Sequence, residues 1–107
     1  MARVSRRLLV IDDTLFDTER VEEAQRLRDS THVRCYSEGE WRGFVSAVGF
    51  EAEEVKVFAA RRVALEPWLD RVATLPTDRA RVRELLGDAT DGSSVRMPLI
   101  VLKARRR

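Results

Sequence analysis

The stretch Arg7-Leu8-Leu9-Val10-Ile11-Asp12-Asp13 decides the fold prediction. Its four consecutive apolar residues stop abruptly at two carboxylates. An apolar run without polar alternation is typical of a strand that is buried on both faces. Acidic residues at the carboxyl end of such a strand lie where open α/β sheets bind their ligands. The alternative is a core strand followed by aspartates that only form a turn or cap the next helix.

Length and composition bound the class of protein. The chain has 107 residues, which suits a single domain spanning residues 1–107. Hydrophobic residues make up 44% of the chain, which is enough for a packed core. Lysine and arginine total 20 against 18 acidic residues, and this balance predicts no nucleic-acid partner. The basic tail from Lys103 to Arg107 is expected to be a solvated tail.

Cysteine usage and hydropathy predict a cytoplasmic protein. Cys35 is the only cysteine, so an internal disulfide is excluded and a reducing compartment is favoured. No apolar run approaches the ~20 residues of a membrane span, and the pattern of a signal peptide is not recognisable. We therefore expect no membrane partner. One histidine and one cysteine cannot make a closed metal site, so no metal is expected either.

The first half of the chain carries two capped helices. A helix from Thr18 to Arg28 is predicted behind a cap at Asp17 or Thr18, with Glu22 on its solvent face. The capping box Ser37-Glu38-Gly39-Glu40 begins a second helix, and Gly49 ends it. This second helix is predicted to bury a large aromatic face, made of residues at three- and four-residue spacing: Trp41, Phe44, Val45 and Val48.

The second half of the chain predicts strand, helix, helix, strand. Alternating residues from Glu51 to Phe58 indicate a strand with one wet face. Pro67 is expected to open a third helix and Pro76 to end it. A fourth helix is predicted from Asp78 to Leu86, and a last strand from Met97 to Lys103. The apolar face of the third helix is predicted to consist of Trp68, Leu69, Val72 and Leu75.

Several segments together resemble the class I S-adenosylmethionine-dependent methyltransferases, and in particular their ubiquinone/menaquinone C-methyltransferase group. The segment Leu27-Arg-Asp-Ser-Thr-His-Val-Arg34 is the most specific, because it is similar to the family's L-R-D-P-S-H-V-R. Residues 1–4 resemble the last helix turn before the family's fifth strand. The other segments that carry the resemblance are Arg7 to Asp13, Ser37 to Trp41, Val48-Gly-Phe-Glu51 and Val55 to Phe58.

The resemblance implies half of a domain. The family's sheet has seven strands in the order 3-2-1-4-5-7-6, and this chain would supply strands five, seven and six. The implied fold is α/β, a three-stranded mixed sheet with helices packed on it, which is a partial Rossmann-like methyltransferase fold and the C-terminal half of the domain. The family's Gly-rich cofactor turn is missing, since the sequence contains no G-x-G. We expect no cofactor-binding residue here, and S-adenosylmethionine only if a partner supplies the N-terminal half.

The resemblance also nominates site residues. Asp12 and Asp13 occupy the place where the family lines its substrate pocket, so Asp12 is a candidate catalytic residue and Asp13 a candidate substrate ligand. His32 resembles a substrate-side base, which suits the near-neutral pKa of a free imidazole. Arg34 and Tyr36 follow at alternate positions as substrate-binding candidates. The alternatives are aspartates that serve as turn or cap residues, and a loop histidine that bonds to the backbone.

Three functions remain open at this point. The first is a methyltransferase-like fragment, or a split-enzyme half, that contributes the substrate side and is not active alone; whether the chain is an enzyme by itself is therefore uncertain. The second is a non-enzymatic dimerising or partner-binding module. The third, a small nucleic-acid module, is the least favoured. In the family the fourth strand covers the edge of the fifth, and this chain has no strand for that place, so Leu8–Ile11 would form an open edge. We therefore expect a homodimer, either through pairing of this strand in two copies or through exchange of the N-terminal segment. A complementary N-terminal half that covers the edge is the alternative.

Overall fold

The structure, a computed structural model, describes residues 2–72 and 74–107. The helices and strands expected between Leu8 and Lys103 are present, and three short strands, β1, β4 and β5, are added to them. None of the helices in these described ranges is long and apolar enough to cross a membrane. The elements are β1 (Ala2–Val4), β2 (Leu8–Thr14), α1 (Glu19–Arg28), α2 (Glu38–Ala47), β3 (Phe50–Phe58), β4 (Arg62–Ala64), α3 (Leu65–Asp70), α4 (Pro76–Leu86), a 3-10 turn (Gly87–Ala89), β5 (Ser94–Arg96) and β6 (Leu99–Arg106).

The main sheet has the strand order β1-β2-β6-β3, and every neighbouring pair is antiparallel. The predicted position of the last strand, between the other two long strands, is confirmed. The prediction of a three-stranded mixed sheet is wrong, because the sheet has four strands and all of its neighbouring strands are antiparallel. The Rossmann-like part of the prediction is not confirmed, since that fold is built on adjacent parallel strands.

The first strand was not expected from the sequence. Residues 2–4 form β1, which pairs antiparallel with β2 and places Val4 opposite Leu9. A tight turn joins the two strands: the Ser5 backbone N–H donates to the Leu8 carbonyl at 2.7 Å, and the Ser5 hydroxyl accepts from the Leu8 N–H at 3.1 Å. The expected helix turn is therefore wrong for residues 2–4, and Met1 lies outside the described residues.

The edge of β2 is thus covered by the chain itself. Opposite Leu9 to Ile11, where a second copy was expected to pair, lies β1. The open edge assumed for Leu8–Ile11 is wrong for this reason, while the homodimer itself stays a prediction. Exchange of β1 between two copies is compatible with this strand order, because each β2 would then pair with the partner's β1.

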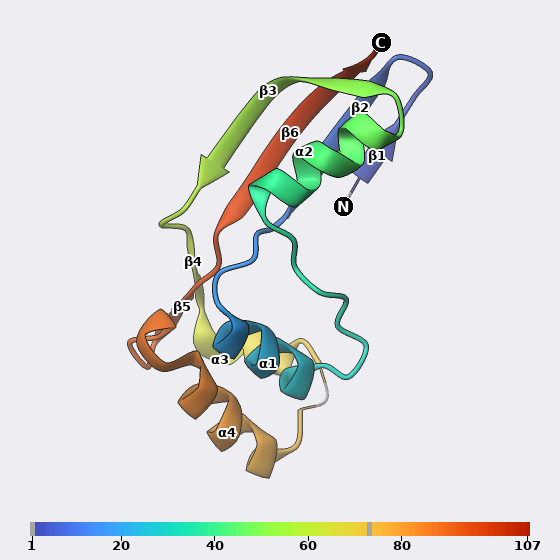
Figure 1. The fold of residues 1–107 in the computed structure, drawn as a ribbon. Coiled ribbons are helices and arrows are strands. Elements are labelled where there is room, and N and C mark those ends of the chain that lie inside the picture. The colour runs from blue at the N-terminus through green and yellow to red at the C-terminus, as the bar shows by residue number, and fades with distance from the viewer. Residues whose placement is uncertain (1, 73) are drawn as a thin grey trace.

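One face of the sheet carries the first hydrophobic core, under α2 (Figure 1). In this helix Val45 is buried and Trp41 is half-buried against the core, whereas Phe44 is 45% exposed and Val48, just after the helix, is 63% exposed. The prediction of a large buried aromatic face is therefore correct only in part, because a single helix lying on a sheet buries only a narrow stripe. The capping box at Ser37 and the turn at Gly49, with φ of 87°, are confirmed. The buried residues of this core are Leu9, Ile11, Leu15, Val45, Phe50, Ile100, Leu102 and Ala104.

No helix within residues 2–72 and 74–107 covers the opposite face of the sheet (Figure 1). Side chains alternate along β2, so Leu9 and Ile11 are buried under α2 while Leu8 and Val10 are only half-buried on the other side. Val101, which lies opposite Asp12 in β6, is half-buried as well. The prediction that Leu8–Ile11 is buried on both faces is therefore correct for one face only.

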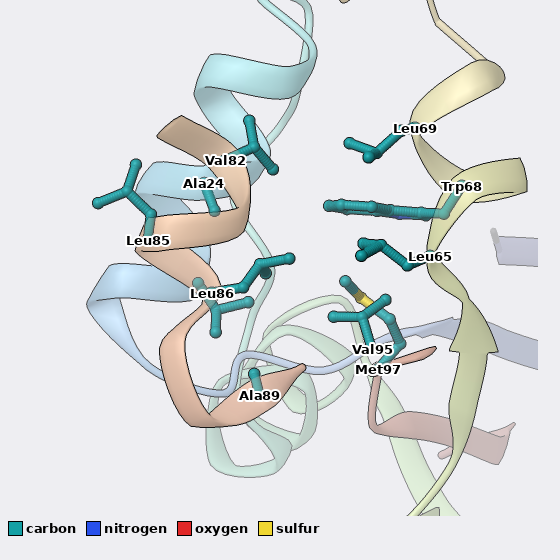
Figure 2. Close-up of a cluster of buried hydrophobic side chains, with 11 residues drawn as sticks. Ala24, Leu65, Trp68, Leu69, Val82, Leu85, Leu86, Ala89, Val95 and Met97 are labelled. Carbon is teal, nitrogen blue, oxygen red and sulfur yellow. The ribbon is translucent and has the colours of Figure 1, made fainter. Parts of the chain in front are cut away.

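A second hydrophobic core lies among α1, α3, α4 and β5, at the far end of the molecule (Figure 1). Leu65, Trp68 and Leu69 of α3 point toward Val82 and Leu86 of α4 (Figure 2). Val21 and Ala24 of α1 belong to the same cluster, together with Leu85, Ala89, Val95 and Met97.

Two prolines act differently from the prediction. The helix α3 begins at Leu65, so Pro67 lies inside its first turn rather than at its start. It ends at Asp70, and Pro76 occupies the first turn of α4 instead of ending α3. Proline is tolerated there because the first backbone N–H groups of a helix have no partner within it. Leu75, expected on the buried face, is 62% exposed because it lies in the connection before α4.

We predict that Leu102→Ala lowers the free energy of unfolding by about 2–5 kcal/mol, the usual cost of truncating a buried leucine. Leu102 is fully buried in the central strand β6. The matched control is Val48→Ala, because Val48 is 63% exposed and its truncation should cost less than ~0.5 kcal/mol. Urea melts of both variants measure the two values, and equal losses would contradict the assignment of the core.

Candidate functional site

A cavity of about 340 Å³ lies at the end of β2, where α1 and α2 meet the connector that joins them. Four of the five predicted site residues line it: Asp13, His32, Arg34 and Tyr36. The remaining lining residues are Thr14, Gln25, Val33, Cys35 and Trp41.

Asp12 is the predicted site residue that does not line this cavity. It is exposed and lies opposite Val101, on the sheet face away from α2. Because successive side chains of a strand alternate between faces, Asp13 and Asp12 cannot both face the same cavity. The carboxylate of Asp13 accepts a hydrogen bond from the Thr14 backbone N–H at 2.8 Å. The structure therefore separates the two aspartates that the sequence places side by side.

The connector between α1 and α2 is shaped by its own polar groups. The carboxylate of Asp29 accepts from both the backbone N–H and the hydroxyl of Thr31, at 3.0 and 2.7 Å. These two hydrogen bonds hold the pKa of Asp29 below its usual value. The His32 backbone N–H donates to the Asp29 carbonyl at 3.0 Å, and Phe16 donates to the Tyr36 carbonyl at 3.0 Å. The connector is thereby turned back toward the end of β2.

Glu22 fixes the middle of this connector, and sequence analysis missed it. Its side chain is buried in α1, with a residue exposure of 1%. One carboxylate oxygen lies 3.2 Å from His32 Nε2, and the other accepts from the Cys35 backbone N–H at 3.1 Å. The prediction that Glu22 lies on the solvent face of the helix is wrong. The helical pattern gives only a weak signal, because at ~100° per residue Glu22 lies beside Gln25 at the edge of the buried face and almost opposite Ala24.

Cys35 is a packed, protonated thiol. Its sulfur accepts from the Gln25 side-chain amide at 3.7 Å and is shielded from solvent. Burial raises the pKa of the thiol to about 12, and the nearby Glu22 carboxylate adds to this shift. A thiolate is the reactive form of cysteine. These contacts fit a packed residue rather than a nucleophile.

Glu22, His32 and Cys35 also form the one group of possible metal ligands found in the described part of the chain, with donor atoms within 4.8 Å of one another. Both oxygens of Glu22 are already within hydrogen-bond distance of a nitrogen of the protein. Binding a metal would also require the loss of a proton from a thiol whose pKa is about 12. The contacts fit a hydrogen-bond network better than a metal site.

An aromatic wall closes one side of the cavity. Tyr36, Trp41 and Phe44 meet edge to face, with ring centroids 4.9 to 5.9 Å apart. Trp41 Nε1 is buried and has no hydrogen-bond acceptor among the described residues. Arg34 lies beside this wall, with its guanidinium 3.7 Å from a Glu40 oxygen and above the ring of Phe16. The site therefore combines aromatic surface, one guanidinium, one imidazole and one carboxylate.

Comparison with known proteins identifies a shared fold. No protein-family model and no curated protein matches this chain. BH2331 of Bacillus halodurans, provisionally described as a methyltransferase, has a TM-score of 0.75 at 21% identity, covering 92% of this chain and 55% of its own. The YcgJ protein of Bacillus subtilis has a TM-score of 0.68 at 22% identity, covering 94% of this chain and 50% of its own. The chain thus has a methyltransferase-like fold and spans about half the length of these two proteins.

We predict that Cys35 reacts slowly with iodoacetamide in the folded protein at pH 8. A rise in thiol pKa from 9.0 to about 12 lowers the thiolate population about a thousandfold, and burial slows access further. Mass spectrometry of the alkylated protein, with and without denaturing urea, measures the rate in each state. Equal rates would show that the thiol is neither buried nor shifted.

Proposed function

We propose that this chain forms the methyl-acceptor side of a class I S-adenosylmethionine-dependent methyltransferase for small molecules, and that it is inactive alone. The observation that carries the proposal is the TM-score of 0.75 to BH2331 over 92% of this chain. Because that likeness covers only 55% of BH2331, the cofactor would be held by structure outside these 107 residues. A likeness of fold does not by itself establish an activity, so the site must supply the rest of the argument.

The residues of this chain do not fit the cofactor. Close approach of a backbone to the cofactor requires a glycine-rich turn directly after a buried strand. Here β2 is followed by Leu15 and Phe16, and the sequence has no G-x-G. The glycines with positive φ, at positions 49, 87 and 92, follow α2, follow α4 and lie in a polar loop. We therefore assign no step of the reaction to a cofactor bound by this chain.

The cavity supports the role of an acceptor pocket. Its volume of about 340 Å³ is at the small end of the ~300–1,000 Å³ typical of ligand pockets. Tyr36 and Trp41 offer apolar surface, while Asp13 and Arg34 offer one charge of each sign to orient a small molecule. His32 would take up a proton from the acceptor. Asp12, on the other face of the sheet, has no part in this pocket.

The uncovered sheet face supports the need for further structure. Half-buried apolar side chains, Leu8, Val10 and Val101, lie on the side that no helix covers. The outer edge of the sheet is protected differently: β3 carries four charged side chains and a bulge between Ala52 and Glu54. A complementary half would therefore meet the open face or the short β1 edge more readily than β3.

Neither solved structure is described as a quinone methyltransferase, so the proposal does not extend to the ubiquinone/menaquinone group. The alternative function is a non-enzymatic module that dimerises or binds a partner. Such a module would use the same uncovered sheet face as the proposed methyltransferase. Binding of S-adenosylmethionine in the presence of a complementary half separates the two functions.

We predict that the isolated chain shows no calorimetric binding of S-adenosylmethionine, because it has no glycine-rich turn. Adding the part of BH2331 that this chain does not cover should create a complex that binds the cofactor. The control is that part of BH2331 alone. Micromolar 1:1 binding by the isolated chain would refute the proposed division, and a complex that forms without binding the cofactor would favour the non-enzymatic module.

A further inference from the structure

The carboxylate of Glu22 occupies a position that demands hydrogen-bond donors. It is 1% exposed, and an ionised carboxylate can only accept hydrogen bonds. One oxygen receives the Cys35 backbone N–H at 3.1 Å, which is a donor whatever the pH. The other oxygen lies 3.2 Å from His32 Nε2, and the nearest guanidinium nitrogen, on Arg26, is 3.9 Å away. His32 Nε2 is therefore the closest partner of the second oxygen, and the Cys35 thiol is a further hydrogen-bond donor to the same carboxylate.

The contact between Glu22 and His32 sets the proton on the imidazole. A neutral imidazole carries one proton, on either Nδ1 or Nε2, and a hydrogen bond at one nitrogen selects the tautomer. Opposite an ionised Glu22, Nε2 must carry the proton, because two facing acceptors would repel each other. The lone pair is then on Nδ1. His32 lines the cavity, whereas Glu22, which meets the ring at Nε2, does not.

We infer that Glu22 is a positioning residue, which holds His32 in the Nε2–H tautomer so that Nδ1 can accept a proton from a molecule bound in the cavity. That this molecule is a methyl acceptor rests on the proposed function. The assignment of the tautomer does not depend on that function. A methyl acceptor that gives its proton to Nδ1 must carry an acidic proton, as a hydroxyl group or an activated C–H group does. The proton would move from that group to Nδ1, and its electron pair would stay on the acceptor atom.

The alternative use of the same atoms is metal binding, which would place Nε2 on a cation instead of Glu22. The Cys35 sulfur that would complete such a site lies within hydrogen-bonding range of Gln25 at 3.7 Å. The two arrangements predict different behaviour of the same imidazole, so one measurement distinguishes them.

His32 is the only histidine of the chain, which makes the test direct. In two-bond ¹H–¹⁵N spectra of the full chain in alkaline buffer, the two ring nitrogens should resolve into a protonated Nε2 and an unprotonated Nδ1. Glu22→Gln should reverse this pattern. Its side-chain oxygen still accepts from the Cys35 N–H, so its NH₂ group faces the ring and requires an unprotonated Nε2.

The matched control is Glu23→Gln, which removes the same charge from the neighbouring, exposed position and should leave the wild-type pattern unchanged. A wild-type ring protonated on Nδ1, or a tautomer that does not respond to Glu22→Gln, would overturn the inference. So would an equimolar shift of the ring signals on addition of Zn²⁺, because Nε2 would then serve a metal. Should Glu22→Gln fail to fold, the wild-type spectrum decides alone.

The outcome is independent of the cofactor experiment. The spectra use the isolated chain and need neither S-adenosylmethionine nor a complementary half. An Nε2–H tautomer together with a failed cofactor titration would leave an oriented histidine in a cavity of another function. If the complementary half restores cofactor binding but the ring is protonated on Nδ1, the proposed methyltransferase function stands. Glu22 and His32 then have no part in its proton transfer.

Discussion

The antiparallel pairing of β2 with β6 is the interaction on which the rest of the structure depends. It runs without interruption from Leu8 opposite Arg105 to Thr14 opposite Leu99. Just beyond it the Leu15 N–H donates to the Pro98 carbonyl at 2.7 Å, so the two segments stay together as they leave the sheet. One segment then leads into α1 and the other comes from β5, which belong to the second core. The ladder therefore connects two hydrophobic cores that are otherwise built from different helices.

Polar contacts hold the helical end of the molecule to this ladder. Arg96, the last residue of β5, forms a two-point ion pair with Asp17, just before α1, at 2.8 and 3.2 Å. This pairing raises the pKa of Arg96, so its charge is retained. On the other side of α1, the Arg28 guanidinium donates to the Trp68 carbonyl at 3.0 Å and stacks over its ring. The first helix is thus fixed at both of its ends, which is a condition for a defined cavity beside it.

Burial of the Glu22 carboxylate carries a large desolvation free energy. An unpaired carboxylate would not remain ionised in such a place, so its two oxygens need donors. The donors come from the connector, at His32 and Cys35, rather than from a regular element. A connector of this length would otherwise have few buried contacts to hold it. The same two hydrogen bonds therefore order the cavity wall and orient its histidine, which links the stability of the connector to the chemistry of the site.

The sequence by itself determined what depends on neighbouring residues along the chain. The strand at Leu8–Ile11, the capping box at Ser37 and the turn at Gly49 follow from local sterics and local hydrogen bonds, so they were predictable. Four of the five site candidates line one cavity. They were predictable because three of them lie in or just after the segment Leu27–Arg34 that resembles the family, and Asp13 lies at the end of the strand beside it. Even the place of the last strand, in the middle of the sheet, followed from the resemblance of the whole chain to a known order of strands.

Only the tertiary structure decided what depends on distant partners. The strand β1 is three residues long, too short for an alternation to identify, and it exists because β2 offers an edge. Asp12 and Asp13 separate because the pleat of β2 directs them to opposite faces of a sheet that is covered on one side. Glu22 was read as a solvent-facing residue because charge predicts exposure, yet its burial depends on donors that lie ten and thirteen residues away. Local physics sets the elements, whereas burial and pairing belong to the assembled fold.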